Sequence, residues 1–247
     1  MDFSLFIPNM LKLWGKYWQI FLFTGLKNTL LLTCISVALG TLLGTLVAMA
    51  KMSKFKPLRA LITVYIEVLR GTPILLQLYI FYFVLPNLLP FLQLSQFMWV
   101  SIALCVNSSA YVSEVIRSGI QAVDKGQMEA ARSLGMSEKQ AMLKIILPQA
   151  VRNILPALGN EFIMMLKETS LASTFFLGDL MTSYQVVKGA AYLTLEPLTI
   201  VAIIYLCLTY PLSKIVERFE KKMASPNSYR NKNKHRVHAW GAFGGKK

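Results

Sequence analysis

Three ionisable residues of this sequence lie within long apolar runs, at positions where they could bind a charged solute. Arg70, Lys167 and Glu168 are each flanked on both sides by mostly apolar residues. A charge at bilayer depth is costly unless it faces protein or water, so residues of this kind are functional candidates. A cationic side chain suits a carboxylate and Glu168 suits an ammonium group, so together they would match a zwitterionic solute.

Polar residues at similar depth in the same runs extend this candidate pathway. They are Thr72, Gln77, Asn107, Ser108, Thr169 and Ser170. The alternative is structural, because intramembrane charges also pair with one another. In that interpretation Glu67, Arg70, Lys167 and Glu168 form internal ion pairs that only hold the helices together, and the sequence leaves both interpretations open.

Membrane-spanning helices are the elements that would position these residues. The chain is 55% hydrophobic and only 15% charged, with a mean hydropathy of +0.49. A helix needs about 20 mostly apolar residues to cross a bilayer core. Five runs meet this requirement, at residues 21–50, 58–85, 97–117, 154–177 and 192–216. We therefore predict an all-α fold, a polytopic membrane bundle of about five transmembrane helices.

Gly71 and Pro73 lie near the middle of the second run and predict a break in its helix. Proline lacks the N–H that would close an i→i−4 hydrogen bond, and its ring clashes with the preceding turn. A broken helix at mid-depth exposes backbone groups to a polar solute. The break is therefore part of the candidate pathway.

Basic residues predict the side of the membrane on which each connector lies. They are concentrated at residues 51–59, at 117–152 and in the C-terminal tail, whereas 86–96 has none and the fourth connector has only Lys188. The positive-inside rule then places the N-terminus outside and the C-terminus in the cytoplasm. This distribution accounts for the formal net charge of +14 without a nucleic-acid partner. The lipid bilayer is therefore an expected partner and nucleic acid is not.

The same patterns divide the chain into three parts. Residues 1–20 are predicted to be an interfacial segment, with Trp14 and Trp18 suited to the headgroup level. Residues 21–222 are predicted to form the transmembrane domain, and 223–247 a basic, disordered cytoplasmic tail.

Catalytic and metal-binding patterns are not found in the apolar part of the sequence. Both histidines, His235 and His238, lie in the basic tail. The three cysteines have no metal-like spacing, and there is no G-x-x-x-x-G-K-[ST] phosphate-binding loop. We therefore expect neither an enzyme nor a metal site.

A charged, capped segment separates the third and fourth runs. Asp124 predicts the start of a helix at residues 125–134, and Gly135 predicts its end at the C′ position. Ser137, followed three residues later by Gln140, predicts the start of a second helix. The segment is therefore expected to be two short helices joined by a glycine turn.

Pro148 would close the second helix and push Leu147 towards extended geometry. Such a two-helix unit could be a linker, a lipid-surface element or a docking knob. Ala130 and Ala131 favour docking, because small side chains let the backbone of a partner approach closely. Glu129 offers an anchoring charge.

The residues of this loop resemble the "EAA" loop of the permease subunits of bacterial ATP-binding-cassette (ABC) importers. The loop residues that carry this resemblance are Glu129-Ala130-Ala131, Gly135 and Ile146-Leu147-Pro148. Further segments resemble the polar amino-acid branch of that family: Glu67-Val68-Leu69-Arg70-Gly71-Thr72-Pro73, Gln77, Asn107-Ser108-Ser109-Ala110-Tyr111, Glu114 with Arg117, Lys125-Gly126-Gln127, Pro148-Gln149-Ala150, Leu158-Gly159-Asn160-Glu161 and Lys167-Glu168-Thr169-Ser170-Leu171. One departure is Glu168, where the family pattern has aspartate.

The resemblance implies a permease subunit of an ATP-driven importer for a polar amino acid, in the bacterial cytoplasmic membrane. The loop at 129–148 would dock on a separate ATPase subunit, present in two copies that bind ATP and Mg²⁺, so no cofactor is expected in this chain. A second permease subunit, the same chain or a sister chain, and an extracytoplasmic solute-binding protein complete the implied assembly.

Two other functions compete with this prediction. A stand-alone ion-coupled secondary transporter or channel would share the polar residues at mid-depth, but it would not need a capped loop of this spacing. Nor do five runs give an obvious inverted repeat. A membrane scaffold for a signalling ATPase would need the loop but not the polar residues. The loop and the polar residues together favour the importer subunit.

Overall fold

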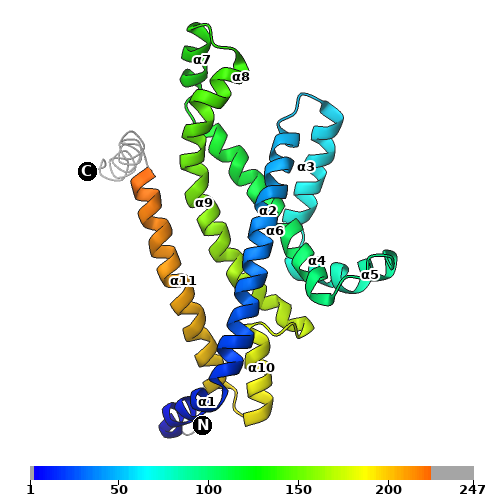
Figure 1. Ribbon diagram of the computed structural model, residues 1–247, viewed down its shortest axis with the longest axis vertical. Coiled ribbons are helices and arrows are strands. Elements are labelled where there is room, and N and C mark those ends of the chain that lie inside the picture. The colour runs from blue at the N-terminus through cyan, green and yellow to red at the C-terminus, as the bar shows by residue number, and fades with distance from the viewer. Residues whose placement is uncertain (1–2, 224–247) are drawn as a thin grey trace, which may run out of the picture. The chain divides into compact units, whose positions relative to one another are not determined.

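The computed structural model describes residues 3–223, and these are almost entirely helical (Figure 1). The elements in chain order are η1 (Phe3–Leu5), α1 (Phe6–Gln19), η2 (Ile20–Leu26), α2 (Lys27–Lys51), α3 (Lys56–Gly71), α4 (Ile74–Tyr79), η3 (Ile80–Val84), α5 (Leu85–Leu88), α6 (Gln96–Gln121), α7 (Lys125–Ser133), α8 (Glu138–Ala141), η4 (Met142–Ile146), α9 (Leu147–Glu168), η5 (Thr169–Phe175), α10 (Leu180–Ala191) and α11 (Leu195–Met223). Of the short elements, η1 and η5 are 3₁₀-helices, whereas η2, η3 and η4 are π-helices. The tail predicted at 223–247 lies outside the described residues, apart from Met223.

The described helices confirm the predicted polytopic membrane bundle. Four helical stretches are long and apolar enough to cross a membrane: Phe6–Lys51, Gln96–Gln121, Glu138–Phe175 and Leu195–Met223. A fifth span is counted if α3 and the segment Ile74–Leu88 are taken as one broken span. By chain contacts, residues 3–118 with 157–213 form a first compact unit, and residues 119–156 with 214–223 form a second.

In the first unit, α2 and α6 cross, and they are in close contact at the crossing (Figure 1). A Cβ atom on Gly40 would lie 2.8 Å from Ser108 Cβ, and one on Gly44 would lie 2.8 Å from Val112 Cβ. Real Cβ atoms do not approach this closely, so both positions need glycine for the two helices to meet. This G-x-x-x-G pattern therefore forms a packing seam inside the subunit.

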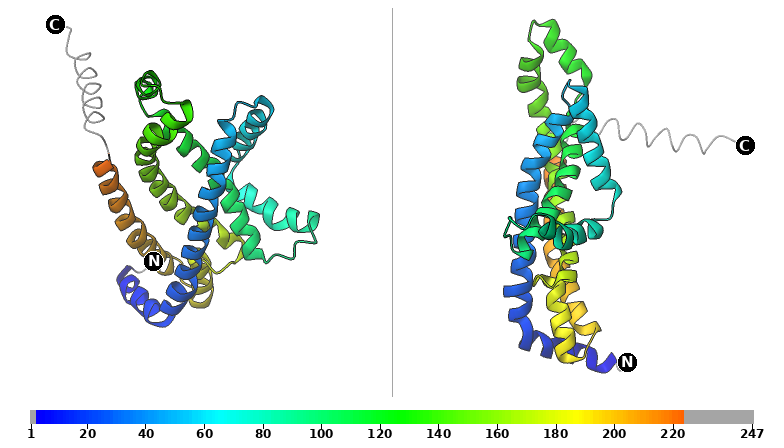
Figure 2. Two further views of the ribbon diagram at one scale, coloured as in Figure 1. Left: turned by 45° about the horizontal axis from the view of Figure 1, so that its top comes forward. Right: turned by 90° about the vertical axis from the view of Figure 1, so that its right-hand side faces the viewer.

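Helix α10, which was not predicted from sequence, packs against η2 in the first unit and is hydrogen-bonded to α2 (Figure 2). Leu180 N–H at its start donates to Thr29 Oγ1 over 3.1 Å, and Ser183 Oγ donates to Ile20 O over 3.1 Å. A Cβ on Gly25 would lie 2.5 Å from Ser183 Oγ, so the backbones of η2 and α10 are in close contact. These contacts fix the start of α10 on the N-terminal part of the chain.

Asp179 caps the N-terminus of α10 from a fully buried position. Its carboxylate accepts hydrogen bonds from Met181 N–H and from the Thr182 hydroxyl. Burial raises the pKa of the Asp179 carboxyl above its ordinary value, and these hydrogen bonds oppose that rise.

In the second unit, Pro148 does not end a helix, and the expectation that Leu147 is extended was wrong. The helix that begins at Glu138 continues through η4 into α9, and Leu147 has helical angles, φ −61° and ψ −42°. Leu147 N–H donates to Met142 O, five residues earlier. This wider π-turn directly precedes the proline ring, which the helix accommodates without breaking. The same arrangement, a π-turn shortly before a proline, is found at η3 and Pro86.

Candidate functional site

The chain turns sharply at the predicted break in the first unit. Lys56–Gly71 and Ile74–Leu88 meet at 105°, and Thr72 between them is extended. Pro73 has no N–H to donate to Leu69 O, four residues earlier. The side chain of Gln77 takes its place: Nε2 donates to Leu69 O over 2.8 Å and to Thr72 O over 3.2 Å. One side chain thus satisfies two carbonyls at the break, Leu69 O and Thr72 O.

Gln77 also joins the break to α6. Asn107 Nδ2 donates to Gln77 Oε1 over 2.9 Å, and the two residues are only 3% and 5% exposed, respectively. Both were assigned to the solute pathway from sequence. In the structure their amides are engaged with each other and with the break, so they position backbone groups in this conformation.

Ser108 lies beside Asn107 and contacts a buried carboxylate. Its Oγ donates to Glu161 Oε1 of α9 over 3.2 Å, and Glu161 is 8% exposed. Glu161 belongs to one of the family-like segments of the sequence but was not predicted as a site residue. Its neighbour in that segment, Asn160, is exposed.

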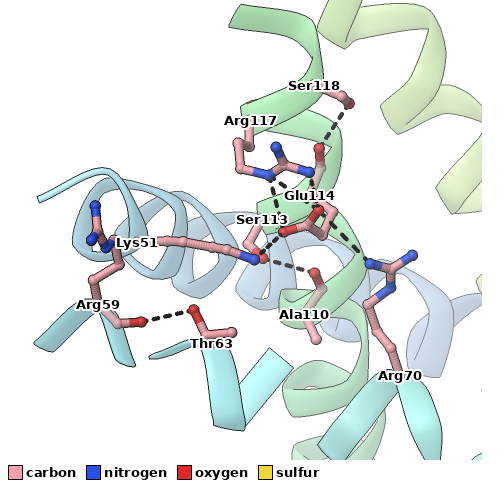
Figure 3. Close-up of polar contacts among 9 residues, drawn as sticks. All are labelled: Lys51, Arg59, Thr63, Arg70, Ala110, Ser113, Glu114, Arg117 and Ser118. Carbon is pink, nitrogen blue, oxygen red and sulfur yellow. Dashed lines mark hydrogen bonds and ion pairs between the residues drawn. The ribbon is translucent and has the colours of Figure 1, made fainter. Parts of the chain in front are cut away.

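Figure 3 shows three cationic side chains, from three helices, around the carboxylate of Glu114. Lys51 Nζ of α2 lies 2.8 Å from Glu114 Oε1, and Arg117 Nη2 of α6 lies 2.6 Å from Oε2. Arg70, near the end of α3, is more loosely placed, with Nη1 3.8 Å from Oε2. The Glu114 side chain is 15% exposed and that of Arg70 is 45% exposed, so Arg70 is at the open side of the cluster.

Arg70 is held by α6 in a second way. Its Cζ lies 5.5 Å from the centroid of the Tyr111 ring, which is a cation–π distance. Asn107, Tyr111 and Glu114 are spaced i, i+4 and i+7, so they share one face of α6. That face contacts Gln77 after the break and Arg70 before it. The internal ion pair expected as an alternative is therefore present for Arg70, but its partner is Glu114.

Lys167 and Ser170 line a pocket of about 300 Å³ in the first unit. The other lining residues are Met181, Leu198, Val201, Ala202 and Tyr205. Of the remaining predicted residues in this segment, Glu168 is half-buried, and Thr169 is buried with its hydroxyl donating to Leu166 O over 2.8 Å. Of the predicted residues at 167–170, Lys167 and Ser170 therefore line the pocket, whereas Thr169 belongs to the core.

In the second unit, the predicted glycine turn is confirmed. Gly135 has φ +83°, a left-handed conformation that favours glycine. Its N–H donates to Arg132 O over 3.0 Å, and Met136 N–H donates to Ala131 O over 3.2 Å. These two bonds form a Schellman motif at the end of α7.

The predicted helix starts on either side of this turn are also confirmed. Asp124 Oδ1 accepts from Gly126 N–H over 2.7 Å at the start of α7. Ser137 and Gln140 form a reciprocal capping box at the start of α8, with distances of 2.9 and 3.2 Å. The coupling knob, which we define as residues 124–148, is thus set by its own local sequence.

Surface exposure separates the contact candidates on the coupling knob. Glu129, Ala130, Gly135 and Pro148 are exposed, as is Leu147 at 36%. Ala131 is only 5% exposed, so its small side chain serves packing inside the unit and is not available to a partner. Leu134, which the sequence analysis did not select, is 84% exposed. A single exposed leucine does not by itself mark an interface, so Leu134 is a contact candidate only because it lies four residues after Ala130, on the same face of α7.

The segments that lead into and out of the coupling knob pack tightly against each other within the second unit. A Cβ on Gly119 would lie 2.4 Å from Ile154 Cγ1, and Asn153 Nδ2 donates to Gly119 O over 3.3 Å. Gly119 was not predicted from sequence, because no local signal marks a glycine whose partner lies 34 residues later. This contact fixes the base of the coupling knob.

These features together are those of a membrane transport subunit: helices that span the bilayer, a broken helix with charged and polar side chains, and a structured polar loop. The chain belongs to the family of inner membrane components of binding-protein-dependent transport systems, which it matches over residues 40–225. Members of this family are permease components, so the chain is not itself an enzyme.

Individual relatives agree with this assignment. The arginine transport system permease protein ArtQ of Bacillus subtilis (strain 168) is 42% identical over 225 residues, which cover 91% of this chain and 98% of ArtQ. The L-cystine transport system permease protein TcyB of the same organism is 36% identical over 84% of this chain and 88% of TcyB. A crystal structure of an amino acid ABC transporter with histidines contains a chain that is 45% identical, with a TM-score of 0.80, covering 84% of this chain and 96% of that one.

Proposed function

We propose that this chain is the permease subunit of an ATP-driven importer and provides the translocation pathway for a polar amino acid. The similar proteins named above are an arginine permease, a cystine permease and a subunit of an amino acid transporter, and all of their substrates carry an α-carboxylate and an α-ammonium group. Lys167 and Ser170 on the wall of one pocket, and Arg70 at the open side of the Glu114 cluster, offer donors for a carboxylate.

In this proposal the coupling knob docks on a separate ATPase subunit, which binds ATP and Mg²⁺. The observation that carries this step is the construction of the coupling knob: two capped helices and a Schellman turn hold Glu129, Ala130 and Leu134 at the surface. A loop that served only to connect two spans would not need three local stop and start signals within 17 residues, from Asp124 to Gln140.

The assembly proposed around this chain has two ATPase copies, a second permease subunit of the same or a sister chain, and an extracytoplasmic solute-binding protein. In it the N-terminus lies outside and the C-terminus in the cytoplasm, as the distribution of Lys and Arg favours. The ATPase copies are then on the side of the coupling knob, and the solute-binding protein is on the other side.

Gly135→Ala tests the docking step. Nothing lies within 4 Å of a Cβ at this position, so the change acts through backbone strain of about 1–2 kcal/mol at φ +83° and not through a clash. We expect the turn to shift, and amino-acid uptake in proteoliposomes to fall while ATP hydrolysis continues or the ATPase dissociates.

The matched control is Gly15→Ala in α1, where a Cβ also meets nothing within 4 Å and φ is not positive. Uptake by this control should equal that of the wild type. Normal total uptake by Gly135→Ala, with the ATPase still bound and uptake per ATP hydrolysed unchanged, would refute docking through this turn.

A further inference from the structure

The first candidate span is much longer than a bilayer requires. Phe6–Lys51 has 46 residues. At 1.5 Å per residue this is about 69 Å of helix, whereas the core of a bilayer is about 30 Å thick. Residues 20–51, which comprise η2 and α2, are long enough to cross it without α1. Figure 2 shows that α1 turns away from the direction of α2 at η2, so α1 does not extend this span.

Two of the three faces of α1 are exposed, and they differ in character. Residues three or four apart lie on one face of a helix. One exposed face is apolar and consists of Ile7, Leu11, Trp14 and Trp18, which are 61%, 62%, 39% and 38% exposed, respectively. The other exposed face is polar and consists of Lys12, Lys16 and Gln19. A helix that combines such an apolar face with a basic polar face is typical of the membrane interface.

The third face holds α1 on the protein, so the exposed faces cannot turn inwards. Leu13 is 6% exposed and belongs to an apolar cluster with residues of α10 and α11. Asn9 Nδ2 also donates to Glu196 Oε1, near the start of α11, over 3.5 Å. Val201 of this cluster, and Met181 packed against it, line the pocket of about 300 Å³ described above. Helix α1 is therefore packed against elements that form part of this pocket wall.

The exposed apolar face of α1 continues onto the first span. The ring centroids of Trp18 and of Phe23 in η2 are 5.7 Å apart, and Phe23 is 66% exposed. These two rings join the apolar face of α1 to the apolar surface of the span. Tryptophan is enriched at the headgroup level, where its ring meets acyl chains and its N–H meets water. The arrangement fits a helix that lies along the bilayer surface.

The polar face of α1 carries positive charge without a carboxylate partner. The 14 residues of α1 include Lys12 and Lys16 but no acidic residue. Neither lysine forms an ion pair within the described residues 3–223. Basic side chains beside a bilayer attract anionic headgroups. In a two-fold contact between copies of the chain through this region, the lysines of both copies would instead repel one another.

We propose that α1 binds the outer surface of the membrane, with its apolar face in the bilayer interface and Lys12 and Lys16 at the headgroups of anionic phospholipids. The outer side follows from the topology proposed above. The bilayer then supports, through α1, the apolar cluster that forms part of the pocket wall. This support of the pocket rests on the proposed function, whereas the contact with lipid does not.

Photo-crosslinking of the purified transporter in vesicles tests this surface without requiring transport. The vesicles contain equal amounts of phosphatidylglycerol and phosphatidylcholine. p-Benzoylphenylalanine replaces Leu11 on the apolar face, and its adducts are identified by mass spectrometry. The matched control carries the crosslinker at Gln19, which is exposed on the polar face. We expect phospholipid adducts at position 11, with a yield at least about tenfold lower at position 19.

The kind of lipid that is captured tests the two lysines. Phosphatidylglycerol adducts at position 11 should exceed phosphatidylcholine adducts at least about threefold, and the double change Lys12→Gln with Lys16→Gln should make the two equal. The control, Lys221→Gln with Lys222→Gln at two exposed positions near the end of α11, should keep the excess. Equal yields at positions 11 and 19, adducts only with protein, a second copy included, or an excess that survives the loss of Lys12 and Lys16 would overturn the proposal.

Uptake by the same vesicles, supplied with ATP and a solute-binding protein, tests the support of the pocket. Loss of the two lysines should lower the rate of uptake at least about twofold in the mixed vesicles and should have no effect in phosphatidylcholine alone. Equal rates of wild type and variant in the mixed vesicles would refute this support. The amino acid used is whichever of arginine, glutamine and cystine the wild type transports. If the wild type transports none of them, the proposed function fails and the support of the pocket fails with it, whereas the adducts still decide the lipid surface.

Discussion

Gln77→Leu tests whether a side chain replaces the hydrogen bond that Pro73 cannot make. The substitution keeps a side chain of similar size but removes the donor to Leu69 O and the acceptor for Asn107 Nδ2. Both groups would then be unpaired in the interior, because Asn107 and Leu69 are 3% and 9% exposed, respectively.

The expected loss follows from these two groups. An unpaired buried polar group costs about 1–3 kcal/mol, whereas hydrogen bonds between membrane helices average only about 0.6 kcal/mol. Doubling each of these values for the two groups gives a lower and an upper limit, and we expect a combined loss of about 2–4 kcal/mol, which lies between them. At about 2–4 °C per kcal/mol for a chain of this size, the apparent Tm should fall by about 4–16 °C.

Thermal unfolding of the purified transporter in one detergent measures this loss. Gln19→Leu, at an exposed position of α1, is the matched control and should melt with the wild type. The decisive comparison is made in a Pro73→Ala background. Alanine restores an N–H and removes the restriction that keeps Thr72 extended before Pro73, so that Thr72 can become helical and this N–H can donate to Leu69 O. Gln77→Leu should there cost about 1–2 kcal/mol less. An equal cost in both backgrounds would show that Gln77 does not substitute for the missing N–H, and the reasoning would be refuted.

Three further outcomes are expected. Lys167→Met should weaken amino-acid uptake at least about tenfold while Lys167→Arg retains most of it, because the pocket wall would lose its cation for the carboxylate; equal uptake by both variants, with assembly checked by co-purification of the ATPase, would contradict this. Glu114→Gln should destabilise the purified protein by about 2 kcal/mol, between the values for exposed and buried ion pairs, because three cations would lose one carboxylate. Without the carboxylate the three cations repel one another, so adding Lys51→Met should recover part of that loss. A double variant that is no more stable than Glu114→Gln alone would contradict this repulsion. Gly119→Ala should cost about 1–3 kcal/mol of stability through its 2.4 Å approach to Ile154, and the additional change Ile154→Ala should remove most of that clash term in a double-mutant cycle.

Local signals allowed much of the coupling knob to be predicted from sequence. Asp124, Ser137 with Gln140, and Gly135 each act within four residues of their own position, so the start and end of α7 and the start of α8 could be predicted directly. The apolar runs predicted the membrane bundle for a similar reason, because hydrophobicity over about 20 residues is itself a local property.

Prediction failed where a longer-range or less common geometry decides the outcome. Pro148 was expected to end its helix because an ordinary α-helical turn has no room for the ring, but a π-turn precedes it. Glu114 was not selected as a site residue, since its partner Lys51 lies 63 residues earlier and Arg70 comes from yet another helix. Gly40 and Gly44 could be recognised as a contact motif, but only the structure shows that α6 is what they contact.

The π-turn at Met142–Ile146 also changes how the surface of this region can be mapped. A residue in an α-helix advances by about 100°, so the extra residue in a π-turn shifts the angular phase of everything that follows it. Cysteine-scanning labelling from α8 into α9 should therefore show two patterns of the same period that are offset from each other, with the discontinuity at residues 142–146. A single helical wheel drawn through Pro148 would assign residues on one side of the turn to the wrong face.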